Sequence, residues 1–336
     1  LLSMFFFCSG LIGTSLAVSM KSVALLYFFY GAVGGIGLGI GYITPVSTLV
    51  KWFPARRGFA TGLAIMGFGF ASLIGGPLMQ KLTALYGLST NFLIMGGAYA
   101  VVMTLSSLYL MPPKAGETVD LTKLSDDASD KLKKAAAAQT GRQYTRREAV
   151  QTWEFWSLWW LFFTNITCGI GLLAVASPMA QEAVGMNAAG AAALVGAIGI
   201  VNGLGRLAWS TLSDWMGRAA TYVLFFVIET AAFFALVQTP SEAVFYILVL
   251  TIISCYGGGF SCMPAFLSDL FGVRQLSSIH GIMLTAWALA GIAGPMLLSV
   301  IKETTGSYHQ TMLVFAGLMS AALVLSIILK IKSTKH

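Results

Sequence analysis

Ten stretches of about 20 predominantly apolar residues follow one another along the chain, and they constrain its fold more than any other feature. A run of this length crosses the roughly 30 Å hydrocarbon core of a bilayer as a helix. Glycine and proline occur within several stretches, and membrane helices tolerate them because neighbouring helices satisfy the freed backbone groups. Only 10% of the residues are charged, which argues against a water-soluble fold. The sequence therefore predicts an all-α polytopic membrane protein with helices over 1–20, 24–50, 58–80, 91–111, 153–178, 188–212, 219–238, 242–268, 277–301 and 309–331.

Lysine and arginine are concentrated in alternate loops between these stretches. Sixteen of the 20 lie in one set of loops and in the C-terminal tail, whereas Lys21, Lys81 and Lys302 lie on the other side. Because positively charged short loops remain in the cytoplasm, we expect both ends of this chain to be cytoplasmic and the protein to span the cell membrane. The net charge of +7 is then a signal for topology, so no nucleic-acid partner is expected.

Two segments of the chain resemble each other. Residues 37–78 and 257–297 both contain a glycine run, a proline within an apolar stretch (Pro45 and Pro264), a basic loop and a Gly-Pro pair. The offset is six apolar stretches, which indicates two parallel repeats of six helices. The fifth and sixth stretches then have no partners upstream, so we expect this chain to lack two N-terminal helices. A natural ten-helix protein is the alternative.

The repeat suggests how the chain is divided. We expect residues 1–111 to form four helices of an N-terminal bundle and residues 153–336 to form a C-terminal six-helix bundle. Residues 112–152 are expected to be a cytoplasmic linker, in which the Ala-rich stretch 125–138 forms a helix on the membrane surface.

An Asp-x-x-Gly-Arg pattern, "DWMGR", closes the sixth stretch at residues 214–218. Together with the parallel repeats and the basic linker, it resembles the major facilitator superfamily, although Ser210 stands where that family usually has glycine. The segments "NGLGRLAWSTLSDWMGR", "CYGGGFSCMPAFLSDLFG" and "IHGIMLTAWALAGIAGP" are similar to the oxalate/formate antiporter family. The resemblance implies a carboxylate transporter without catalytic chemistry or cofactor, with Asp214, Gly217 and Arg218 in a cytoplasmic gating loop.

Arg206 stands inside the sixth apolar stretch, about 10 Å from its cytoplasmic end at 1.5 Å per residue. Its side chain either reaches back to the interface, pairs with Glu229 on the next stretch, or faces a cavity. A guanidinium matches a carboxylate in a bidentate fork, so Arg206 is the first candidate for substrate binding.

In oxalate-handling members of the family, the resemblance implies a second cation, a lysine, at the position of Trp287. Because one fixed cation balances one carboxylate, we expect a monocarboxylate such as lactate, pyruvate or formate. Trp287 and Tyr256 would form an aromatic wall for its apolar part. Asn202, Asn165 and Tyr30 are polar groups within apolar stretches, which either line the pathway or form hydrogen bonds between helices.

Two titratable residues, His280 and Glu229, are candidates for proton coupling. His280 could equally make a loop contact, and Glu229 could neutralise an interior arginine. Proton symport and anion exchange by alternating access therefore both remain open.

The four cysteines form no metal-binding pattern, and we expect a monomer without bound metal.

Three other functions compete with monocarboxylate transport. One is an oxalate/formate-type exchanger, and another is a sensor that binds a carboxylate without moving it. The third is a membrane-embedded enzyme or respiratory subunit with haem, which would need paired histidines inside the membrane. His309 and His336 lie at the edge of a stretch and in the tail, so the sequence disfavours this enzyme.

Overall fold

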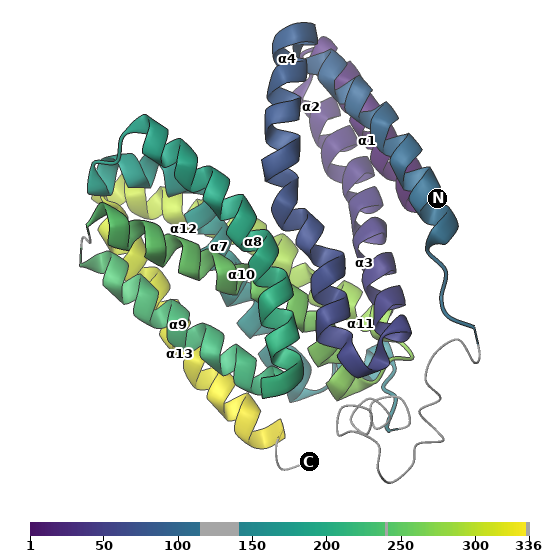
Figure 1. Ribbon diagram of the computed structural model, residues 1–336, viewed down its shortest axis with the longest axis vertical. Helices are drawn as coiled ribbons and strands as arrows, with labels where there is room; N and C mark the ends of the chain where they lie inside the picture. Colours follow the sequence, from purple (N-terminus) through teal and green to yellow (C-terminus); the bar gives the residue numbers. More distant parts are fainter. Residues whose placement is uncertain (115–140, 239–240, 334–336) are drawn as a thin grey trace. The chain divides into compact units, whose positions relative to one another are not determined.

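The computed structural model describes residues 1–114, 141–238 and 241–333 (Figure 1). Within these ranges, nine helices are long and apolar enough to cross a membrane. One of them, α4 (Arg57–Tyr109), has 53 residues and would extend about 80 Å as a single straight helix. It is interrupted at Gly87, where φ is 81°, and Figure 1 shows it turning back on itself. Because α4 supplies two crossings, the expected all-α membrane fold is confirmed.

The chain forms two compact units. The first contains residues 1–52 and the residues that follow 70 in α4. In this unit α2, a short π-helical stretch η1 and α3 continue into one another as a single span. The helices before α4 are α1 (Leu2–Ser19), α2 (Val23–Leu26), η1 (Tyr27–Val33) and α3 (Gly34–Trp52).

Close packing in the first unit depends on small residues. A Cβ atom at Gly10 of α1 would lie 2.6 Å from the Cα of Gly34 at the start of α3. Ser3 donates a hydrogen bond to the carbonyl oxygen of Gly37 at 2.7 Å. Ser15 of α1 is joined to Ser89, in the second half of α4, at 2.9 Å. These contacts hold α1 against both α3 and α4, as small residues commonly do in membranes.

The second unit contains residues 53–70 and the described residues from 141 onward. The linker helix expected at 125–138 lies outside the described residues. The elements of this unit are η2 (Pro54–Arg56), the first part of α4, α6 (Arg146–Ala149), α7 (Trp153–Val184), α8 (Ala188–Met216), α9 (Arg218–Val237), α10 (Glu242–Phe271), α11 (Leu276–Met283), α12 (Thr285–Thr305) and α13 (Tyr308–Ser333).

Helix α10 lies at the centre of the second unit. It packs against α7, α8 and α9, while α12 packs on α7 and α13 packs on α9. Its residues from Cys255 to Ser268 are all buried, although a lipid-facing helix would expose one side. The burial of α10 on all sides makes it the element that positions side chains from its neighbours.

Candidate functional site

The side chain of Arg206 is buried in the second unit, with 5% of its surface exposed. Its Nε atom donates a hydrogen bond to Oδ1 of Asn202, one turn earlier on α8, at 3.2 Å. The guanidinium carbon lies 5.0 Å from the centre of the Phe260 ring on α10, within the range of a cation–π interaction. An amide oxygen and an aromatic face therefore both contact this cation.

The glycine run of α10 brings it close to α8 at this point. A Cβ atom at Gly257 would lie 2.8 Å from Asn202 Oδ1 and 3.2 Å from Cγ of Arg206. Ser261, one turn further along α10, donates to the carbonyl oxygen of Arg206 at 2.7 Å. The glycine run thus places the Arg206 side chain directly against the α10 backbone.

Three aromatic residues meet beside Arg206. The Phe260 ring centre lies 5.4 Å from that of Tyr256, and also 5.4 Å from that of Trp287 on α12, with edge-to-face geometry in both pairs. The structure therefore brings Arg206, Asn202, Tyr256 and Trp287 to one place. Phe260, which joins them, was not predicted. Its position four residues after Tyr256, on the same helix face, was the signal that could have found it.

A second polar cluster lies on α7 and α9. Nδ2 of Asn165 donates hydrogen bonds to both carboxylate oxygens of Glu229, at 2.9 and 3.1 Å. Both side chains are buried, with 1% and 0% exposed. Asn165 also touches α10, because a Cβ atom at Gly259 would lie 3.0 Å from its Cγ. Glu229 thus takes an amide as its hydrogen-bond partner, where the sequence had suggested pairing with Arg206 as one possibility.

The two remaining candidates lie elsewhere. Tyr30 belongs to η1 in the first unit, where 56% of its surface is exposed and its ring centre is 6.2 Å from that of Phe92. His280 lies on α11, which leads into α12, and is 1% exposed. Their roles in binding and proton coupling stay predictions.

The gating-loop residues hold the start of α4 against α8. The two carboxylate oxygens of Asp214 accept hydrogen bonds from the backbone N–H groups of Gly58 and Phe59, each at 3.0 Å. Asp214 also pairs with Arg218. The N-terminus of a helix has unpaired N–H groups and a partial positive charge, so a carboxylate is the ligand that this end prefers.

Gly217 adopts φ 87°, a conformation that side-chain-bearing residues avoid. This backbone turn lets Arg218 fold back on Asp214 and also donate to Asp269 on α10 at 3.4 Å. Arg57 in turn donates to Asp269 at 3.0 Å. Sequence reasoning missed Arg57 and Asp269, whose only signal was a charged residue at each of two helix ends.

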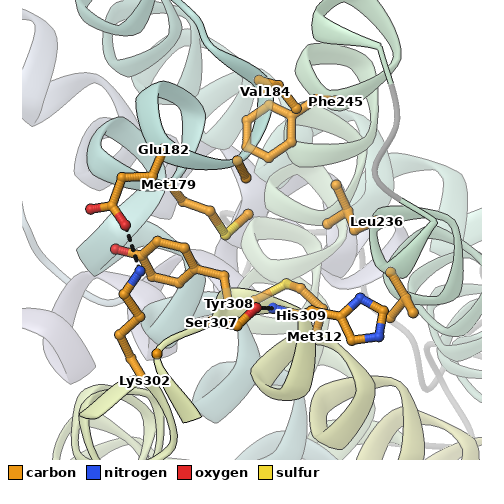
Figure 2. A pocket seen from close by; sticks show the side chains of 13 residues that line it. Met179, Glu182, Val184, Leu236, Phe245, Lys302, Ser307, Tyr308, His309 and Met312 are labelled. Atoms are coloured by element: carbon orange, nitrogen blue, oxygen red, sulfur yellow. Dashed lines mark hydrogen bonds and ion pairs between the residues drawn. The ribbon is translucent and has the colours of Figure 1, made fainter.

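A cavity of about 260 Å³ opens where α7 and α12 end (Figure 2). Nζ of Lys302 donates to Glu182 at 2.5 Å and lies 3.8 Å from the centre of the Tyr308 ring. Figure 2 shows His309 on the other side of the cavity, beside Met312. No sequence pattern predicted this pocket, because Glu182 and Lys302 are 120 positions apart in the chain.

The cysteines and acidic residues offer little to a metal ion. In the part of the chain that the structure describes, no three or more His, Cys, Asp or Glu side chains gather as metal ligands. The four cysteines are buried thiols.

Comparisons with known proteins place the chain in a family. The chain is 27% identical to apicoplast pyruvate carrier 1 of Toxoplasma gondii, over 93% of this chain and 66% of the carrier. It is 26% identical to the oxalate:formate antiporter of Oxalobacter formigenes, over 85% of this chain and 65% of the antiporter. The chain thus spans slightly less than two thirds of the length of these relatives.

A solved structure shares the fold. The human organic anion transporter MFSD10 superposes with a TM-score of 0.71 at 15% identity, over 96% of this chain and 76% of that protein. The sequence model of the Major Facilitator Superfamily matches residues 1–295. As a multi-pass helical membrane protein with this sequence match, the chain belongs to the Major Facilitator Superfamily.

Proposed function

We propose that the protein is a secondary transporter that moves a small carboxylate across the cell membrane by alternating access. The buried guanidinium of Arg206 carries this proposal. It is held by an amide oxygen and an aromatic ring, and it has the geometry that binds a carboxylate through two parallel hydrogen bonds. The names of the pyruvate carrier and the oxalate:formate antiporter point to the same class of substrate.

A monocarboxylate such as lactate, pyruvate or formate is the proposed substrate. Arg206 supplies one cation, and the rings of Tyr256, Phe260 and Trp287 beside it suit a short apolar tail. Asn202 and Asn165 are proposed to line the substrate pathway from α8 and α7, and Tyr30 of the first unit is a separate candidate for substrate binding. Lipid and the carboxylate, with a proton, are the expected partners of a monomeric protein.

The remaining sequence predictions form part of the proposal. The basic loops favour cytoplasmic positions for both ends of this chain. The N-terminal bundle is proposed to include residues 1–111, the linker 112–152 and the C-terminal bundle 153–336. The contacts of Asp214 with the start of α4 support a gate at the cytoplasmic end of α8.

Counterflow in proteoliposomes tests the function. The full native protein, loaded with unlabelled substrate, should take up labelled lactate, pyruvate or formate and prefer them to oxalate. Binding should fall in the order Arg, Lys, Gln at position 206, because lysine keeps the charge but loses the fork. Arg142→Gln, at a side chain that is 71% exposed, is the matched control and should bind normally. Binding without flux would identify a sensor and contradict the proposal.

An oxalate/formate exchanger is the second candidate, supported by the likeness to the oxalate:formate antiporter. Trp287→Lys separates the two. A second cation at this position should shift preference toward dicarboxylates by about 1.5–3 kcal/mol, the range for a hydrogen bond to a charged group. Competition of oxalate against labelled lactate measures the shift. Wild-type protein that already prefers oxalate would favour the exchanger.

A further inference from the structure

Glu229 is a fully buried carboxyl group in the middle of a membrane-spanning helix. It is the twelfth residue of α9, about 17 Å from the start of that helix at 1.5 Å per residue. Its hydrogen bonds come from a neutral amide nitrogen, Nδ2 of Asn165. Ionisable residues at such depth are costly and usually serve ion or proton pathways.

Asn165 carries an unused acceptor at the same place. Its Nδ2 atom serves both oxygens of Glu229, whereas its Oδ1 atom is buried and has no hydrogen-bond partner among the described residues. An amide oxygen has two lone pairs, and leaving both unpaired in the protein interior costs free energy. The atom therefore lacks a donor that another state of the protein can provide.

Protonation of Glu229 supplies that donor. A neutral carboxyl group has one O–H donor and one C=O acceptor, and an amide has the complementary pair. If the Asn165 amide turns about its Cβ–Cγ bond, Oδ1 accepts from the O–H group while Nδ2 donates to the C=O oxygen. Both side chains are then satisfied. The step forms an O–H bond on Glu229 and converts a hydronium ion to water, and its reverse releases the proton.

The environment of Glu229 adds few other titratable groups. Cys168 on α7 and Cys255 on α10 are the thiols near enough to interact with it electrostatically. From the described parts of α8 and α13, which also pack on α9, no charged group contributes. Apart from its burial, the influence that acts on Glu229 is therefore the hydrogen-bonded amide of Asn165.

The amide is also in contact with the proposed substrate site. Gly259 lies against Asn165, and its carbonyl oxygen accepts a hydrogen bond from the Tyr222 hydroxyl at 2.8 Å. If the Asn165 amide turns, Nδ2 replaces Oδ1 as the atom that contacts Gly259 of α10. The next residue on α10 is Phe260, whose ring contacts Arg206.

We propose that Glu229 and Asn165 form the proton-binding element of the transporter, with the amide of Asn165 switching its hydrogen bonds as Glu229 gains and loses the coupled proton. This proposal rests on the proposed carboxylate transport and makes it proton-coupled.

Two transport assays on the full native protein, with labelled lactate, test the proposal. Counterflow at equal pH on both sides needs no net proton movement, whereas accumulation driven by a pH gradient does. Glu229→Gln should retain counterflow, and its accumulation should fall to the level seen without a gradient. Glu182→Gln, a carboxylate that is 53% exposed at the end of α7, is the control and should keep both activities.

Gradient-driven accumulation by Glu229→Gln at the wild-type level would overturn the proposal. So would loss of counterflow by a folded Glu229→Gln protein, because that result indicates a structural role. Wild-type protein that shows counterflow but ignores the pH gradient would refute the coupling while leaving carboxylate transport intact. Absence of counterflow with any carboxylate would instead refute the proposed function.

A second measurement does not depend on the folding of Glu229→Gln, because it uses the wild-type protein. Infrared difference spectra of the wild-type protein on acidification should show the C=O band of a protonated carboxyl group. Asn165→Ala should shift this band, whereas Asn91→Ala, at another buried asparagine, should leave it in place. A spectrum in which no carboxyl band responds to Asn165→Ala contradicts the proposal.

Discussion

Two arginines in the second unit are similarly buried but have different neighbours. Arg218, 9% exposed, pairs with the carboxylates of Asp214 and Asp269. Arg206, 5% exposed, contacts the amide oxygen of Asn202 and the ring of Phe260. Arg218 is the last residue of the Asp-x-x-Gly-Arg pattern, and Arg206 precedes that pattern on α8, the helix in which the pattern begins.

We propose that Arg218 is a structural cation and that Arg206 is a binding cation. Carboxylates neutralise Arg218, and its removal would leave negative charge buried at the end of α8. Arg206 contacts an amide oxygen and an aromatic ring, and we propose that its guanidinium binds the incoming carboxylate. Substitutions around Arg218 should therefore lower the stability of the protein, whereas substitutions around Arg206 should weaken substrate binding.

The largest effect is expected for Asp214→Ala. It removes the acceptor of two backbone N–H groups of α4 and leaves Arg218 without its nearest carboxylate. Breaking a buried pair costs about 3–5 kcal/mol of unfolding free energy, which thermal unfolding in detergent would measure. Asp269→Ala is the comparison: its side chain is 42% exposed, and the loss should stay within about 1 kcal/mol. Equal losses for both variants would contradict the distinction.

Arg206→Gln should weaken binding and change stability little. Loss of a charge-assisted hydrogen bond is worth about 1.5–3 kcal/mol, which corresponds to roughly ten- to hundredfold weaker lactate binding. Titration of lactate into purified protein, with thermal unfolding in parallel, measures both quantities. A well-folded Arg206→Gln protein that binds lactate and pyruvate normally would end the assignment of Arg206 as the binding cation.

Gly217→Ala should be intermediate in its effect on stability. At φ 87° a Cβ atom is strained, and the cost is about 1–2 kcal/mol for a residue forced into such a conformation. Gly196→Ala on α8 is the matched control, since open space surrounds that position and alanine favours a helix. Thermal unfolding should therefore rank Gly217→Ala below the wild-type protein and Gly196→Ala at or above it.

The smallest effect concerns Glu148, at the start of α6 outside the membrane spans. Hydrogen bonds from the backbone N–H and the hydroxyl of Thr145 lower the pKa of its carboxyl group. Because the folded pKa lies below the unfolded value, the ionised form stabilises this helix start above the unfolded pKa. That contribution is lost as pH falls through the folded pKa. The protection factor of the Thr145 amide, which is the ratio of its intrinsic to its observed hydrogen-exchange rate, should fall in acid, and Glu148→Gln should remove that pH dependence.

The sequence by itself determined the spans and the family. Hydropathy is a local property, so each apolar stretch could be recognised without knowledge of its neighbours. The Asp-x-x-Gly-Arg pattern likewise placed Gly217 in a loop, whereas its φ of 87° came only from the structure. Arg206 could be singled out because a cation inside an apolar run is costly wherever the helix lies.

Only the tertiary structure decided the partners of these residues. The pairing of Glu229 with Asn165, and of Arg57 with Asp269 212 positions away, depends on how each helix is rotated about its axis. Successive residues of a helix are rotated by about 100° and therefore face different neighbours. The mean hydropathy of an apolar stretch does not reveal which face meets which helix. The glycine run of α10 lets α7 and α8 approach α10 closely. Asn165 then lies against Gly259, and Arg206 lies against Gly257.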